Sequence, residues 1–378
     1  MQTFCKKNVK KLQKRFFPYI CGMEERTFDY KWKLSETNFT KDKGKVFSCF
    51  ACGGGSTMGY KLAGFDVLGC NEIDPKMMEA YTTNHKPKYS FLEPIQTFKD
   101  RNDLPQELYN LDILDGSPPC SSFSISGNRE KDWGKEKKFK EGQAKQVLDT
   151  LFFDFIDLAK KLQPKVVIAE NVKGLLLGSA KSYVREIYRE FDKAGYIVQH
   201  WLLNASRMGV PQRRERVFFI ALRKDLAAPF LQHKDFFTYA PGLNLIFKDK
   251  EIPFNNIFHD YTDRPLSEHY IKFWDIRKHG DIDFSNSSSR MNKNPNAQFQ
   301  YKYLYMNKVA NTITAGEQCV LFDYPRYRNF DELCECGTYP KDYNFIKNKP
   351  EYLIGMSVPP VMTARIAQRV YDQWLSKL

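Results

Sequence analysis

The stretch VFSCFACGGG, residues 46–55, decides the fold of this 378-residue chain. Its apolar first half predicts a buried strand, and the three glycines Gly53, Gly54 and Gly55 predict a tight turn that enters a helix. Backbone amides at such a helix start favour an anionic group, so the turn suits a dinucleotide and an adenosyl cofactor equally. Glu72, at the end of the next predicted strand, is placed to accept hydrogen bonds from ribose hydroxyls in either case.

Strand and helix patterns alternate on both sides of this stretch. Apolar runs predict strands at residues 46–51, 65–70, 111–114, 165–169, 197–203 and 217–221. Helical periodicity lies between them, at residues 56–62, 75–84, 144–162 and 182–194. Strands that alternate with helices of this length indicate an α/β fold with a mostly parallel sheet and right-handed crossovers.

Composition divides the chain into four parts. They are a basic N-terminal extension (1–43), a first domain with the sheet (44–223), a smaller loop-rich domain (224–346) and a C-terminal segment (347–378). The smaller domain is rich in Asn, Asp, Pro, Tyr and Phe, and its polar and aromatic loops suit the reading and stacking of bases. The C-terminal segment predicts an amphipathic helix that returns to the first domain.

Charge and cysteine usage restrict the partners and the compartment. The net charge of +13 favours a polyanionic partner such as nucleic acid. Nine cysteines without a disulfide framework fit a reducing compartment, and no apolar stretch approaches the length that spans a membrane. We therefore expect a cytoplasmic protein with no membrane partner and no metal site.

A candidate nucleophile and a candidate acid follow two predicted strands. Cys120 comes directly after Pro118 and Pro119, which restrict the backbone and direct the thiol out of the sheet edge. Glu170 and Asn171 come directly after the apolar strand at 165–169. The carboxyl ends of parallel strands meet at one edge, so Cys120 and Glu170 can face one pocket. Taken singly, a buried structural thiol and a helix N-cap acid are the commoner interpretations.

Two arginines precede the last predicted strand of the first domain. Arg214 and Arg216 alternate, so both side chains can project to the same side. A guanidinium there can bind the exocyclic oxygen of a base or a flanking phosphate, and it would lower the pKa of a neighbouring thiol. The alternative is a surface arginine cluster paired with Glu215.

The glycine turn, the cysteine block, the Glu-Asn pair and the arginine block, in this order, resemble the DNA cytosine-C5 methyltransferase family. The resemblance implies a Rossmann-like, S-adenosylmethionine-dependent methyltransferase domain with a mixed, mostly parallel sheet, plus a smaller target-recognition domain. It implies methyl transfer to carbon 5 of a cytosine flipped out of duplex DNA, through a covalent Cys120 adduct at carbon 6. Glu170 would engage the Watson–Crick edge of the cytosine and Asn171 would support that site. Arg216 would contact the base, and Arg214 the DNA backbone or its neighbours.

The resemblance also implies binding residues for cofactor and DNA. S-adenosyl-L-methionine would contact Phe50, Gly53, Gly54, Gly55, Glu72, Ile73, Ile95, Pro118, Leu151, Ser357 and Val358. Ser124 and Ser126 match loop residues that contact DNA around the extruded base, and Arg290 lies in the polar, aromatic part of the smaller domain. We expect a monomer acting on duplex DNA in a bacterial or phage-infected cell, in a restriction-modification system that admits a separate cognate endonuclease.

Other functions remain open at this point. An RNA cytosine-C5 methyltransferase would carry the same catalytic blocks, because one branch of the family modifies transfer RNA. A non-catalytic DNA-binding relative would keep the fold. A dinucleotide oxidoreductase ranks last because it leaves the cysteine block unexplained, and methylation of an amino group is disfavoured because a thiol stands where those enzymes need a polar acceptor.

The chain departs from the family pattern at five positions. Ser48 stands where most members have an aspartate, and Cys52 where a glycine is usual. Pro94 stands where an aspartate often contacts adenine, Met356 replaces a common asparagine, and Ser121 replaces a common glutamine. None of these changes removes a reacting group, so the sequence predicts altered cofactor affinity rather than loss of chemistry.

Overall fold

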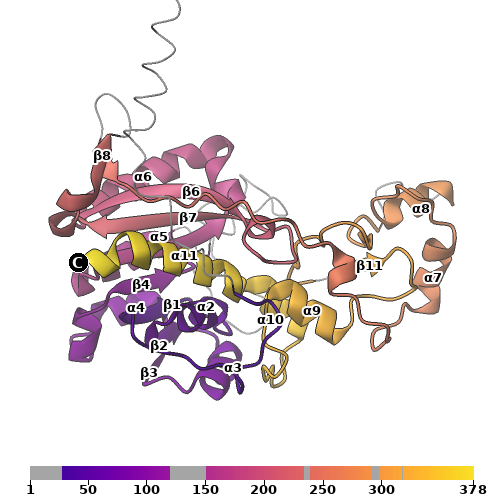
Figure 1. The fold of residues 1–378 in the computed structure, drawn as a ribbon, viewed down its shortest axis with the longest axis horizontal. Helices are drawn as coiled ribbons and strands as arrows, with labels where there is room; N and C mark the ends of the chain where they lie inside the picture. The colour runs from indigo at the N-terminus through magenta and orange to yellow at the C-terminus, as the bar shows by residue number, and fades with distance from the viewer. Residues whose placement is uncertain (1–27, 120–149, 234–238, 292–297, 317) are drawn as a thin grey trace, which may run out of the picture.

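A seven-stranded sheet forms the centre of the computed structural model, which describes residues 28–119, 150–233, 239–291, 298–316 and 318–378 (Figure 1). The strands are β1 (Lys45–Cys49), β2 (Asp66–Glu72), β3 (Tyr89–Leu92), β4 (Ile113–Gly116), β5 (Val166–Val172), β6 (Tyr196–Asn204) and β7 (Glu215–Arg223). Their order across the sheet is β3-β2-β1-β4-β5-β7-β6. Only β7 runs antiparallel to its neighbours β5 and β6, so the predicted mixed, mostly parallel sheet is confirmed.

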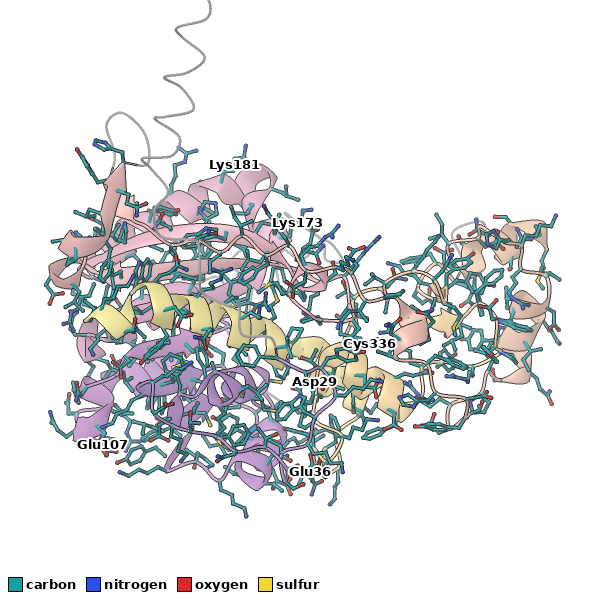
Figure 2. All side chains as sticks on the ribbon, viewed as in Figure 1. Asp29, Glu36, Glu107, Lys173, Lys181 and Cys336 are labelled. Atoms are coloured by element: carbon teal, nitrogen blue, oxygen red, sulfur yellow. The ribbon has the colours of Figure 1, made fainter. Side chains whose placement is uncertain are left out.

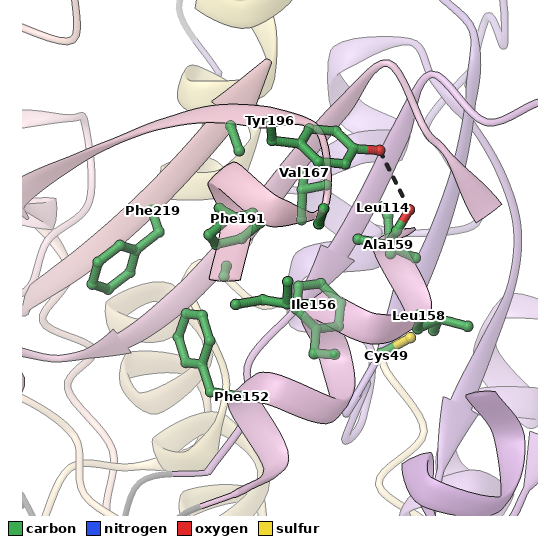
Figure 3. Close-up of a cluster of buried hydrophobic side chains, with 14 of the residues drawn as sticks. Cys49, Leu114, Phe152, Ile156, Leu158, Ala159, Val167, Phe191, Tyr196 and Phe219 are labelled. Atoms are coloured by element: carbon green, nitrogen blue, oxygen red, sulfur yellow. Dashed lines mark hydrogen bonds between the residues drawn. The ribbon is translucent and has the colours of Figure 1, made fainter. Parts of the chain in front are cut away.

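Helices cover both faces of this sheet. They are α2 (Gly55–Ala63), α3 (Pro75–His85), α4 (Ile95–Asp100), α5 (Leu151–Leu162), α6 (Lys181–Lys193) and α11 (Pro360–Gln373). Side chains alternate along each strand, so Phe47 packs with α4, α5 and α6, whereas its neighbour Val46 packs with α2 and α11. Figure 3 shows the first of these clusters, in which Phe152 and Ile156 of α5 lie near Phe191 of α6.

The sequence predicted the elements of the first domain with local errors. The short edge strand β3 and the six-residue helix α4 were missed, because neither is long enough for a periodic pattern. The strand β5 continues to Val172, so Glu170 and Asn171 lie within it rather than after it. Residues 144–149 of the predicted long helix lie outside the described residues, and α5 begins at Leu151.

Between residue 223 and the start of α11 the described elements are short. They are β8 (Leu231–His233), β9 (Tyr239–Pro241), α7 (Glu268–Asp275), α8 (Phe284–Arg290), β10 (Tyr303–Leu304), β11 (Val320–Leu321), α9 (Phe330–Gly337) and α10 (Pro350–Met356). The helices α7 and α8 and the β10–β11 pair share a separate aromatic core, which we call the aromatic unit. Figure 1 shows this unit on the far side of α9 and α10 from the central sheet.

The C-terminal segment joins the parts of the molecule. The helix α11 packs against α2, and Trp374 at its end is fully buried. Leu333 of α9 and Leu353 of α10 share one hydrophobic cluster with Met58 of α2 and Met77 of α3. Segments on both sides of residue 346 therefore pack together, and the predicted domain boundaries stay predictions. Within the described residues, no helix has the length and apolar character needed to cross a membrane.

Candidate functional site

A hollow opens where β1 and β4 end. It is formed by the turn after β1, the end of β4 and the segment after α10, and it holds about 280 Å³ of space that is open to solvent. Four residues that were expected to bind the cofactor line this hollow: Phe50, Gly55, Ser357 and Val358. The hollow therefore brings together residues from two distant stretches for which the sequence predicts cofactor contacts.

The glycine turn is shaped by its backbone and by a close contact. Phe50 has a φ of 53° and Gly54 a φ of 84°, so the chain leaves the extended conformation as soon as β1 ends at Cys49. A Cβ atom at Gly55 would lie 2.6 Å from the carbonyl oxygen of Val358. Only glycine lets the helix α2 start this close to the segment after α10, which is how two distant stretches come to line one hollow.

Glu72 braces the same turn from the end of β2. Its Oε2 accepts a hydrogen bond from the backbone N–H of Cys52 at 2.7 Å. Its Oε1 accepts from the N–H groups of Ile73 and Asp74 at 2.8 and 2.9 Å. Burial raises the pKa of Glu72, while these three amide donors oppose that shift. A carboxylate offers about four acceptor positions, so the expected contact with a ribose hydroxyl still has room.

The other expected cofactor residues lie outside the lining of the hollow. Gly53 turns its carbonyl oxygen toward the hydroxyl of Tyr343, which donates to it at 2.6 Å. Ile95 and Leu151 are buried in the hydrophobic cluster beneath the sheet. The remaining ones are Gly54, Ile73 and Pro118. The cofactor contacts of all these residues stay predictions.

Asp115 is a functional candidate that the sequence analysis missed. It lies on β4, lines the hollow and is only 5% exposed. The hydroxyl of Ser48 donates to its Oδ2 at 2.8 Å, and the hydroxyl of Tyr60 donates to its Oδ1 at 3.0 Å. Burial raises the pKa of Asp115 to about 7, with a smaller contribution from the negative charge of Glu170. The sequence did contain a signal for Asp115, because it is an acidic residue that directly follows the apolar residues Ile113 and Leu114 of a buried strand.

The candidate acid and one candidate arginine are brought together. Nε of Arg216 lies 2.9 Å from Oε1 of Glu170, and both side chains are largely buried. The amide of Asn171 donates to the carbonyl oxygen of Pro118 at 3.1 Å, which ties the end of β4 to β5. Cys120 itself lies outside the described residues. The segment that leads to it is thus held next to the Glu170–Arg216 pair.

Arg214 takes a different place from the one expected. Its guanidinium is 2% exposed and donates to the carbonyl oxygens of Ile313 and Gly355, each at 3.0 Å. It connects the start of β7 to two segments from the second half of the chain. These segments cover the side chain and give it a structural role, and its expected contact with the DNA backbone or its neighbours stays a prediction.

The expected DNA-binding residues are only partly described. Ser124 and Ser126 lie outside the described residues. Arg290 ends α8, and its guanidinium donates to Asp281 at 3.1 Å and to the carbonyl oxygen of Ile276 at 3.1 Å. These bonds hold it within the aromatic unit, and its contact with DNA stays a prediction.

A basic side chain also follows the Glu-Asn pair in the sequence. Lys173 comes directly after β5 and lies 2.8 Å from Glu215, and both side chains are exposed. Figure 2 shows Lys173 on the upper side of the molecule, between the central sheet and the aromatic unit. Because an exposed pair of this kind contributes little to stability, Lys173 can exchange its partner for a phosphate at small cost.

Comparison with known proteins connects this geometry to one family. A sequence model of C-5 cytosine-specific DNA methylases matches residues 44–372. The type II methyltransferase M.FnuDI of Fusobacterium nucleatum is 39% identical over 183 residues, 48% of each chain, so the chain spans about half the length of that relative. The type II methyltransferase M1.HphI of Haemophilus parahaemolyticus is 26% identical over 85% of each chain.

A solved structure shares the fold. A protein described as a DNA modification methyltransferase encoded within a prophage of E. coli superposes with a TM-score of 0.59 at 20% identity, over 87% of this chain and 99% of the other. At that identity the likeness concerns the fold alone.

Proposed function

The chain belongs to the C-5 cytosine-specific DNA methylase family, and we propose that it transfers a methyl group from S-adenosyl-L-methionine to carbon 5 of cytosine in duplex DNA. The family match over residues 44–372 supports this activity. The names of the type II relatives support a place in a restriction-modification system, with a separate cognate endonuclease as its counterpart.

Carbon 5 of cytosine is too weak a nucleophile to accept the methyl group by itself, so the reaction needs a nucleophile from the protein. The Cys120 thiolate adds to carbon 6, and the electron pair that is released makes carbon 5 nucleophilic. When bound, S-adenosyl-L-methionine supplies the electrophilic methyl group. Loss of the proton from carbon 5 then expels the Cys120 sulfur and restores the aromatic ring.

The Glu170–Arg216 pair is the observation that carries the proposal. Addition of sulfur places negative charge on the ring, and Glu170 stabilises it by sharing a proton with nitrogen 3. Arg216 holds the Glu170 carboxylate at 2.9 Å and faces the exocyclic oxygen of the base. Asn171 fixes Pro118, two residues before Cys120 in the sequence, through its hydrogen bond to the Pro118 carbonyl. One anchored segment can thus carry the thiol beside the acid.

A cytosine stacked in a duplex cannot reach this site, so the target nucleotide must rotate out of the helix. The rotation costs a few kcal/mol, which phosphate contacts by lysine and arginine offset. The net charge of +13 supports such contacts. We propose that one monomer acts on each site, in the cytoplasm of a bacterial or phage-infected cell.

A trapping experiment tests the nucleophile. With duplex DNA that carries 5-fluorocytosine, the reaction should stop at the covalent adduct, because fluorine cannot leave as a proton does. Wild-type protein with cofactor should form a complex that survives denaturation, and Cys120→Ser should form none. Cys319→Ala, which removes a buried thiol from the hydrophobic cluster that includes Leu333 of α9 and Leu353 of α10, should still form it. An adduct formed by Cys120→Ser would refute this assignment of the nucleophile.

A methyl-transfer assay tests which nucleic acid is the substrate. Methyl transfer to duplex DNA and to transfer RNA should be measured side by side with the wild-type protein. Transfer to RNA alone would replace the proposed substrate by the RNA alternative, and specific DNA binding without transfer to either would point to the non-catalytic relative.

A further inference from the structure

We propose that Asp115 binds the α-ammonium group of the methionine part of the cofactor, inside the hollow at the ends of β1 and β4. The inference rests on the proposed function, because it concerns the cofactor of that reaction. It assigns a positioning role to a residue that the family pattern does not point to.

The register of the sheet places an acid and a hydroxyl side by side. Ser48 on β1 pairs with Asp115 on β4 in the parallel ladder, so their side chains project from the same face. Both residues line the hollow, together with the hydroxyl-bearing residues Ser117 and Ser357. The recess at this end therefore carries several polar groups, and among the described residues that line it Asp115 has the only charged side chain.

Neutral groups are the hydrogen-bond partners of the acid in the part of the chain that the structure describes. Both of its oxygens accept hydrogen bonds, but the donors are the neutral hydroxyls of Ser48 and Tyr60. Among the described residues, no lysine or arginine forms an ion pair with Asp115. A buried carboxylate without a cation is costly, and a cationic ligand group in the hollow would remove much of that cost.

The geometry favours the ammonium over the other polar parts of the cofactor. An ammonium offers three N–H donors, which suits a recess of carboxylate and hydroxyl oxygens, whereas a sulfonium offers none. The ribose hydroxyls have Glu72 as their expected partner at the end of the neighbouring strand β2. The α-ammonium is then the group left to fill the recess at Asp115.

Several titratable groups surround this acid and bear on a pH test. Glu170 on β5 raises the pKa of Asp115 by its negative charge, and the Tyr60 hydroxyl on α2 lowers it by donating a hydrogen bond. Cys49 on β1 and Tyr81 on α3 have pKa values raised by burial and, in smaller part, by Asp115, so both stay neutral near pH 7. Of these described groups, Asp115 is thus the one whose pKa lies near 7.

Binding measurements separate this proposal from its alternatives. By calorimetry at pH 8, Asp115→Asn should weaken binding of S-adenosylhomocysteine, which keeps the ammonium and has no sulfonium, by about 10- to 100-fold. Binding of 5′-methylthioadenosine, which has neither group, should change by less than about threefold on the same grounds. Wild-type affinity for S-adenosylhomocysteine should fall as the pH drops through about 7, and the variant should lose that dependence.

A swapped pair is the matched control. The double variant Ser48→Asp with Asp115→Ser moves the carboxylate to the paired position on β1 and keeps one acid and one hydroxyl in the hollow. It should regain most of the lost affinity, which a mere folding defect in Asp115→Asn would not explain. Melting curves of each variant verify that it is folded.

The outcomes are distinct. If the variant weakened S-adenosylmethionine but not S-adenosylhomocysteine, the partner would be the sulfonium and the ammonium assignment would be overturned. Equal losses for S-adenosylhomocysteine and 5′-methylthioadenosine would also overturn it. If the wild-type protein bound none of the three compounds, the proposed function would fail together with the inference.

Discussion

The buried carboxyl of Asp115 should make the protein without its cofactor less stable at high pH, and Asp115→Asn should remove that penalty. The folded-state pKa is about 7, against about 3.9 for an unfolded aspartate. The folded state therefore holds a proton that the unfolded state has lost. Stability is present below about pH 4 and is lost as the pH rises toward about 7.

The size of the effect follows from these two pKa values. Each unit of difference corresponds to about 1.4 kcal/mol, so relative to pH values below about 4 the folded state loses about 4 kcal/mol of stability at pH 8 and about 1–2 kcal/mol at pH 5. Asn keeps the shape of the side chain and can still hydrogen-bond both hydroxyls. The gain in unfolding free energy of Asp115→Asn should then be larger at pH 8 than at pH 5 by about 2–3 kcal/mol.

Urea unfolding of the cofactor-free protein, followed by tryptophan fluorescence, measures this difference. Any pH-independent effect of the amide cancels between the two pH values. Asp103→Asn is the control, because its carboxyl is exposed and its pKa is lowered by Arg101, so no gain that grows with pH is expected. A difference below about 0.5 kcal/mol between the two pH values would refute the reasoning about burial.

Three further predictions follow from the packing and the charge. Arg214→Gln removes the guanidinium that binds the Ile313 and Gly355 carbonyls. In urea titrations this change should lower the unfolding free energy by about 2–4 kcal/mol, and a loss below about 1 kcal/mol would contradict the structural role of Arg214. Gly55→Ala would put a methyl group 2.6 Å from the Val358 oxygen. It should weaken S-adenosylhomocysteine binding about tenfold in calorimetry, and unchanged binding would show that the start of α2 and the segment after α10 can separate freely. Affinity for duplex DNA should fall by about tenfold or more between 50 and 200 mM salt, and a flat response would exclude the phosphate contacts.

Much of the fold could be predicted because its signals are local. The alternation of apolar strands and amphipathic helices identifies the sheet domain, and the run Gly53 to Gly55 identifies the turn at its edge. The elements that were missed, β3 and α4, have four and six residues, too few to establish a period. The loop-rich second half of the chain gave no periodic signal, and its aromatic core forms from residues far apart in the sequence.

The residues of the candidate site could be predicted where they stand at the end of an apolar run that forms a strand. Glu170 was identified because it ends an apolar run, and it stands in contact with Arg216 on the adjacent strand β7. Arg214 and Arg216 look equivalent in the sequence, yet one is covered by residues 313 and 355 and the other reaches the acid. The difference comes from segments that lie about 100 and 140 residues away.

The sequence by itself determined the family, the alternation of the longer strands and helices in the sheet domain, and the identity of the thiol, acid and arginine proposed for the chemistry, because each is encoded in a short run of neighbouring residues. Only the tertiary structure decided that Asp115 and Ser48 share one recess, and that the segment after α10 closes over Gly55. Those contacts join residues that are distant along the chain. Burial and the partners that reach a side chain set its charge and its role, and both arise only when the strands pair and the C-terminal helix packs against them.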